Sequence, residues 1–183
     1  WLAFPGCSNG GADTGGLKPG GPFVVLRTEP ADNGTLFLNE PIRIDFTQPL
    51  DLGSVDLTTF SFQVLDQLGN VVAEPPAGNF QIDRSPGDVD VGRRLLFVPR
   101  LPTDDSFSNG GFRPGRTYIV QLVGGSRLNG TVLRDTAGKG LSEPVTFRFQ
   151  TADGTTLDQL FRNTVAGGPT RTSFVVTPTP DTT

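Results

Sequence analysis

The chain has 183 residues, with 24 glycines, 16 prolines and a formal net charge of −4, and its length suits one domain with flanking segments. It contains no histidine and a single cysteine, Cys7, which excludes histidine-based nucleophile systems, histidine-ligated zinc or haem, and an internal disulfide. The acidic balance argues against a nucleic-acid surface, and no apolar stretch approaches the roughly 18 residues of a membrane-spanning helix.

Residues 1–22 form a Gly-rich leader. Its apolar start, the small Gly6 and then Cys7 are similar to the cleavage boundary of a bacterial lipoprotein, which makes Cys7 a candidate for lipidation and the only expected link to a membrane. Phe4 and Pro5 depart from the aliphatic and small residues usual at their positions. The alternative is therefore a free thiol in a flexible tether.

Residues 23–152 show an alternation of period two, in which every second side chain is apolar. Half-buried antiparallel strands require this alternation because successive side chains point to opposite faces of the sheet. Four segments show it clearly: PIRIDF, FSFQVLD, TYIVQL and VTFRFQT. With the more apolar LLFVP, with FVVLRT and with the weaker VVAEP and NFQID, they predict seven to eight strands. Many short strands with regular turns predict an all-β sandwich.

Asn-Gly and related pairs separate these segments, in DNGT, QLGN, SNGG and LNGT. Asn33 and Asn129 each lie in an Asn-Gly-Thr glycosylation sequon. Because Asn-Gly is also a favoured tight-turn dipeptide, we interpret both as turn residues.

The segment FRPGRTYIVQL places a Pro-Gly turn shortly before Tyr118, the only tyrosine of the chain. This spacing is typical of a tyrosine corner, in which the hydroxyl bonds to nearby backbone at the start of a Greek-key strand. We therefore predict a structural role for Tyr118.

Together with EPADNGTLFLNEPIRIDFTQPLDL, LRDTAGKGL and VTFRFQT, this segment resembles the bacterial Ig-like (Big) domain of S-layer and other surface proteins. The resemblance covers about Glu29 to Thr151, with departures at Asn33, Phe112 and Lys139. It implies an Ig-like Greek-key β-sandwich and an extracellular or cell-surface building block that is not catalytic and often occurs in tandem.

Aspartates gather in two loop segments, and loop carboxylates can bind Ca²⁺. Asp83, Asp88 and Asp90 lie in DRSPGDVDVG, while Asp104 and Asp105 lie in PTDDS. Neither segment has a recognised calcium-loop spacing, so solvated turn residues are the favoured interpretation. We expect no cofactor, with Ca²⁺ as the alternative.

After the sandwich, residues 153–169 form a short helix or a linker. Leu157, Leu160, Phe161 and Val165 have helical spacing, which predicts two to three turns. Residues 170–183 contain another strand-like run, in which Phe174, Val175 and Val176 are the expected anchors. This terminal strand is either the start of a following repeat or a strand donated to the sheet edge of a neighbouring copy.

These features predict a structural module of a bacterial surface protein that lacks catalysis. We expect its partners to be copies of itself, in a filament or surface layer, or neighbouring Ig-like domains. The alternative is an adhesive or ligand-binding domain, with or without Ca²⁺, of a surface lipoprotein.

Overall fold

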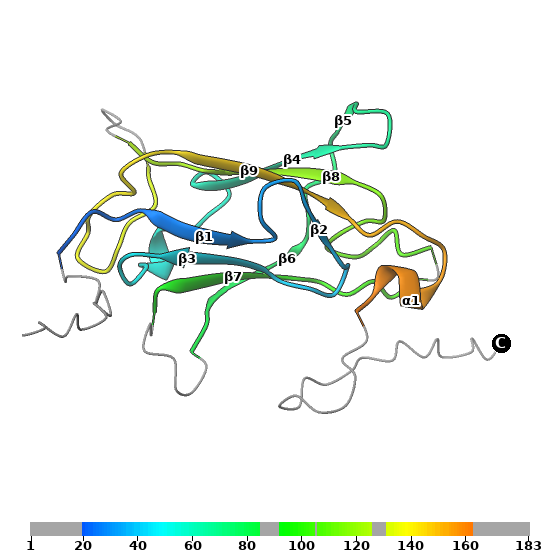
Figure 1. The fold of residues 1–183 in the computed structure, drawn as a ribbon, viewed down its shortest axis with the longest axis horizontal. Helices are drawn as coiled ribbons and strands as arrows, with labels where there is room; N and C mark the ends of the chain where they lie inside the picture. The colour runs from blue at the N-terminus through cyan, green and yellow to red at the C-terminus, as the bar shows by residue number, and fades with distance from the viewer. Residues whose placement is uncertain (1–19, 85–91, 105, 126–130, 163–183) are drawn as a thin grey trace, which may run out of the picture.

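The structure is a computed structural model that describes residues 20–84, 92–104, 106–125 and 131–162. Within these ranges, nine strands and two short helical segments form a sandwich of two stacked sheets (Figure 1). The elements are, in chain order, β1 (Val25–Glu29), β2 (Gly34–Leu36), β3 (Ile42–Phe46), η1 (Leu52–Ser54), β4 (Phe60–Leu65), β5 (Val71–Val72), β6 (Gly78–Ile82), β7 (Arg94–Pro99), β8 (Thr117–Leu122), β9 (Val145–Thr151) and α1 (Leu157–Leu160).

The strand order identifies the topology. One sheet has the order β1-β3-β7-β6 and the other has the order β2-β9-β8-β4-β5. These orders correspond to the two sheets of an immunoglobulin sandwich, with the first strand divided between them and one strand added beyond β4. All pairings are antiparallel except that of β2 with β9, which is parallel. The predicted all-β, Ig-like Greek-key sandwich is therefore confirmed.

The alternation seen in the sequence places apolar side chains between the sheets. In β3, Ile42, Ile44 and Phe46 are buried, and in β9 Phe147 and Phe149 are buried while Arg148 between them is exposed. The polar residues of each strand consequently form the two outer faces of the sandwich.

Aromatic rings connect the two sheets in the middle of the core. Phe60 of β4 contacts Phe80 of β6 with ring centroids 4.8 Å apart, and the ring of Phe97 in β7 lies 5.8 Å from that of Phe112. Phe112 in turn lies 5.1 Å from Tyr118 of β8. Contacts at these separations add to the free energy gained by burying the rings.

Three local features differ from the sequence prediction. β2 was not expected, because it follows a turn sequence and has only three residues. β5 is limited to two residues of the expected VVAEP strand. The helix is a single turn, Leu157–Leu160, instead of two to three turns, because Phe161 already has an extended backbone; Val165 lies outside the described residues.

The helix α1 closes one end of the sandwich (Figure 1). Leu160 is fully buried, and its carbonyl accepts a hydrogen bond of 2.9 Å from the amide of Leu38. Arg162 forms an ion pair of 2.6 Å with Glu40. The last described residues are thus attached to the loop between β2 and β3.

We predict that Phe112→Ala lowers the free energy of unfolding by about 3–5 kcal/mol, because it removes a fully buried ring and leaves a cavity. The matched control is Leu68→Ala, at a side chain that is 86% exposed, for which we expect a change within about 0.5 kcal/mol. Urea unfolding measures both. Equal losses in the two variants would contradict the proposed core.

Candidate functional site

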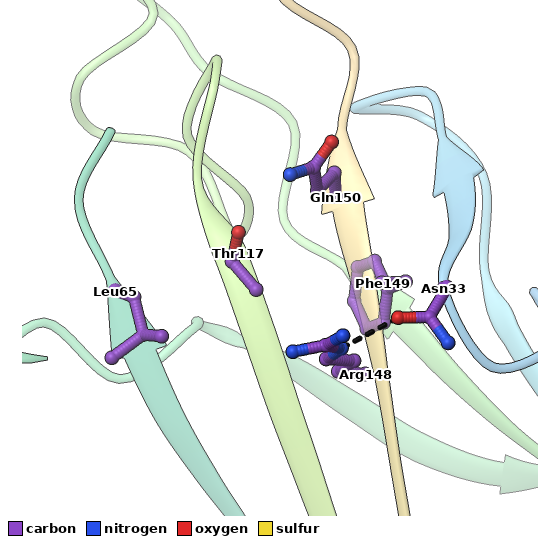
Figure 2. A pocket seen from close by; sticks show the side chains of 6 residues that line it. All are labelled: Asn33, Leu65, Thr117, Arg148, Phe149 and Gln150. Atoms are coloured by element: carbon purple, nitrogen blue, oxygen red, sulfur yellow. Dashed lines mark hydrogen bonds between the residues drawn. The ribbon is translucent and has the colours of Figure 1, made fainter. Parts of the chain in front are cut away.

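The outer face of the five-stranded sheet carries a shallow hollow of about 360 Å³. Figure 2 shows its lining side chains on neighbouring strands. Leu65 of β4 pairs with Thr117 of β8, and Thr117 pairs with Gln150 of β9, so these three residues form one row across the sheet. Arg148, one position along that face of β9, Asn33 and Phe149 complete the lining.

Asn33 fixes the position of the arginine in this hollow. The Arg148 Nε donates a hydrogen bond of 2.6 Å to the Asn33 side-chain oxygen (Figure 2). Asn33 has a φ of 63°, a left-handed conformation that asparagine tolerates better than most residues. The Arg148 backbone amide donates to the Asp32 carboxylate at 2.9 Å. The short turn before β2 therefore holds one cation over a polar sheet surface.

The chemistry available in the hollow is hydrogen bonding and a single positive charge. None of the side chains that line it is a carboxylate, a cysteine or a histidine. Phe149, which also borders the hollow, has its ring fully buried in the core on the inner side of β9. Without an acid–base pair, this surface can bind a polar or anionic group but has no means of general acid–base catalysis.

The outer face of the other sheet carries a network of ion pairs centred on Asp45. Its carboxylate accepts from Arg94 at 2.6 Å and from Arg27 at 2.9 Å, while Glu29 binds Arg43 at 3.2 Å. Burial alone would raise the pKa of Asp45, but the hydrogen bonds and charges of the two arginines outweigh it and hold the pKa below its ordinary value. This network joins three strands.

Other aspartates stabilise turns. Asp56 accepts hydrogen bonds from the Thr58 hydroxyl and from the amides of Thr58 and Thr59, and these bonds lower the pKa of its carboxyl. Asp66 accepts from Asn70, which likewise lowers its pKa. In such Asx turns, the carboxylate accepts hydrogen bonds from nearby backbone amides. The carboxylates of Asp56 and Asp66 therefore have a structural role in these turns.

Tyr118 lies at the start of β8 and is buried. Its hydroxyl accepts a hydrogen bond of 2.9 Å from the backbone amide of Arg113, five residues upstream, which is the arrangement of a tyrosine corner. Burial raises the pKa of Tyr118, and the Arg113 amide opposes the shift. The hydroxyl therefore satisfies a backbone donor at the turn that enters the strand.

Only two of the calcium candidates, Asp83 and Asp104, lie in the described residues, and each contacts other side chains there. The Asp83 carboxylate lies 3.4 Å from the guanidinium of Arg94, and Asp104 accepts hydrogen bonds from Ser106 and Ser108. Among residues 20–84, 92–104, 106–125 and 131–162, no three acidic or sulfur- or imidazole-bearing side chains gather as metal ligands. The other candidates lie outside the described residues; they are Asp88, Asp90, Asp105, Cys7, Asn129, Phe174, Val175 and Val176.

The sequence prediction did not identify the hollow. Arg148 and Gln150 were placed on an outer face by the alternation in VTFRFQT, but nothing in a single strand shows that Thr117 and Leu65 share its row. Asn33 was interpreted as a turn residue, and its contact with Arg148 links positions 115 residues apart. Only the register of the sheet brings these residues together.

Comparisons with known proteins give structural neighbours alone. No family model and no curated protein sequence matches the chain. In the described part of the chain, no helix is long and apolar enough to cross a membrane.

Many solved structures are similar to the chain, among them three that cover about seven tenths of it. CopC from Methylosinus trichosporium OB3b is 14% identical, over 70% of this chain and 92% of its own, with a TM-score of 0.37. Selenomethionine PcoC, a copper resistance protein from Escherichia coli, is 12% identical, over 69% and 97%, with a TM-score of 0.41. The N-terminal part of the bacterial S-layer protein SbsC is 18% identical, over 71% of this chain and 23% of its own, with a TM-score of 0.40. Because these scores are low, the fold assignment rests on strand order and register.

We predict that Tyr118→Phe lowers the free energy of unfolding by about 1–3 kcal/mol, because the ring is retained while the Arg113 amide loses its acceptor. Thermal or urea unfolding measures the change. An unchanged stability would show that the hydroxyl has no structural role.

We predict that Asp45→Asn destabilises the protein by about 1 kcal/mol at pH 7. Since the folded-state pKa of Asp45 lies below 3.8, its ion pairs contribute fully above that pH and are lost as the pH falls through the folded value. The difference between wild type and variant should therefore close in acid. Urea unfolding from pH 7 downward measures it, with the exposed Glu143→Gln as control; a difference that is constant with pH would contradict the network.

Proposed function

We propose that this chain is a non-catalytic structural module, an Ig-like domain of a bacterial extracellular or cell-surface protein. It associates with copies of itself or with neighbouring Ig-like domains. The observation that carries the proposal concerns the ionisable groups. The aspartates considered above bind arginines or turn backbones, and the hollow on the outer face of the five-stranded sheet has no carboxylate in its lining. These polar side chains therefore stabilise the fold, as expected of a structural module.

The sequence resemblance supports the surface location, because Big domains are building blocks of such proteins. The sandwich has an extensive apolar core and, with one cysteine in the chain, no internal disulfide, which suits a building unit stabilised by its core. The strand-like residues 170–183 supply a means of association, since an extended segment can complete the open edge of another sheet. Head-to-tail donation of this kind extends into a filament unless the rotation between copies closes a ring.

The test compares the full chain with a version that ends at Gly168, by size-exclusion chromatography with light scattering. We expect the full chain to form oligomers and the shortened chain to be a folded monomer, because the described strands of the sandwich lie before residue 168. The oligomer should have the higher melting temperature, since a donated strand stabilises the sandwich that receives it. If both are monomers of equal stability, association through the terminal strand is wrong, and residues 170–183 belong to a following repeat.

A further inference from the structure

The four sheet edges of the sandwich differ in how they are protected against added strands. The β1 edge has a β-bulge between Val25 and Arg27 and carries the charged Arg27 and Glu29. β2 has three residues and β5 has two. Bulges, charges and shortness are the usual means by which proteins prevent edge-to-edge pairing. Three of the four edges therefore have such a protection.

The fourth edge, β6, has none of these protections. Its sequence is GNFQI, with no charge and no proline, and its pairing with β7 runs through five residues without a bulge. Within the described part of the chain, no hydrogen bond between backbones reaches the side of β6 that faces away from β7. β6 is thus the longest regular edge available for pairing.

The register shows which backbone groups face this open side. Asp83 donates to Arg94, and Ala77 accepts from Arg100, so both flanking residues direct their backbone groups at β7 and its continuation. In an antiparallel pair these hydrogen-bonded positions recur at every second residue. Asn79 and Gln81 therefore also face β7. The N–H and C=O groups of Gly78, Phe80 and Ile82 consequently point to the open edge.

The side chains of β6 form an apolar seam beside that edge. Phe80 and Ile82 are only half-buried, although they pack against the core, whereas Asn79 and Gln81 are exposed on the outer face. A further strand would find backbone partners and apolar side chains at the same positions, and it would cover the remaining exposed surface of Phe80 and Ile82. Both contributions stabilise strand addition.

The segment Ser173–Thr177 of this chain has the matching pattern. Its sequence SFVVT is uncharged, and Phe174 and Val176 lie two positions apart, so they share one face of an extended strand. Ten residues separate it from Arg162, the last described residue, a length that spans up to about 35 Å. The segment can therefore extend from its own sandwich to a neighbouring one.

We propose that the open edge of β6 receives Ser173–Thr177 of a neighbouring copy as an antiparallel strand, with Phe174 opposite Ile82 and Val176 opposite Phe80. This inference rests on the proposed function and identifies the receiving surface. In this register Val175 lies opposite Gln81 on the outer face, at a non-hydrogen-bonded pair. The Cα atoms of such a pair are about 4.5 Å apart, a separation that permits a disulfide.

The experiment uses full-length chains in a Cys7→Ser background, which removes the only native thiol. Gln81→Cys and Val175→Cys variants are mixed and mildly oxidised, and the linked peptides are identified by mass spectrometry. We expect a Gln81–Val175 crosslink between chains. The matched control replaces Gln81→Cys by Leu26→Cys, at a side chain that is 54% exposed on the β1 edge, and we expect at least about tenfold less crosslinking there because the bulge and charges oppose pairing.

Each other outcome contradicts a different statement. Oligomers in which the crosslink forms equally well at Leu26 would overturn β6 as the receiver and leave self-association intact. A crosslink within one chain of the Gln81→Cys, Val175→Cys double variant, at a dilution where chains are monomeric, would show that the segment folds back on its own sandwich. A full chain that is monomeric at all concentrations would refute self-association itself, and the inference with it.

Discussion

The contact of aromatic rings between the two sheets is the interaction on which this structure depends. Antibody-type sandwiches place a disulfide and a tryptophan at the centre of the core, whereas this chain has one cysteine and its only tryptophan lies at position 1. Rings from β4, β6, β7 and β8 occupy that central space, with Phe112 between Phe97 and Tyr118. The stacked pair of Tyr118 and Phe149, with ring planes 13° apart, continues the cluster along β8 and β9. Removal of one ring would therefore affect both sheets.

The two outer faces of the sandwich have different characters that follow from this core. Because most inward positions are apolar, most polar side chains of the strands lie on the outer faces, with the buried Thr151 of β9 as an exception. On the outer face of the four-stranded sheet, Asp45 forms ion pairs with Arg94 and Arg27. These ion pairs join adjacent strands. The other face carries the row Leu65, Thr117 and Gln150 beside Arg148, which is mostly uncharged. The two faces thus differ in their charge and in the hydrogen bonds that they form.

Much of the fold could be predicted from the sequence because the physical signal is local. Alternation of apolar residues located the strands, and the Pro-Gly turn before Tyr118 indicated a tyrosine corner. What escaped prediction depends on partners far apart in the chain. The three residues of β2 become a strand only because β9 lies beside them. Arg94 reaches Asp45 across 49 positions, and the hollow depends on a register shared by three strands. A helical pattern in 157–165 likewise could not show that Phe161 is extended.

The sheet edges differ in their protection against added strands, and the proposed association at β6 rests on this difference. Three edges are short, bulged or charged, and β6 is regular and neutral. Such an edge is a hazard for aggregation unless something covers it. In the proposed assembly, a strand from a neighbouring copy covers the open β6 edge. The edge that would promote aggregation of a single domain then joins two domains.

Amide hydrogen exchange along β6, residue by residue, tests this account most directly. In a chain that ends at Gly168, the amides of Asn79 and Gln81 should exchange slowly because they bond to β7, while those of Gly78, Phe80 and Ile82 should exchange fast. In the full-length chain at concentrations where it is oligomeric, the amides of Phe80 and Ile82 should become slow. Equal exchange of Phe80 and Ile82 in the two chains, or fast exchange of Asn79 and Gln81 in both, would contradict it.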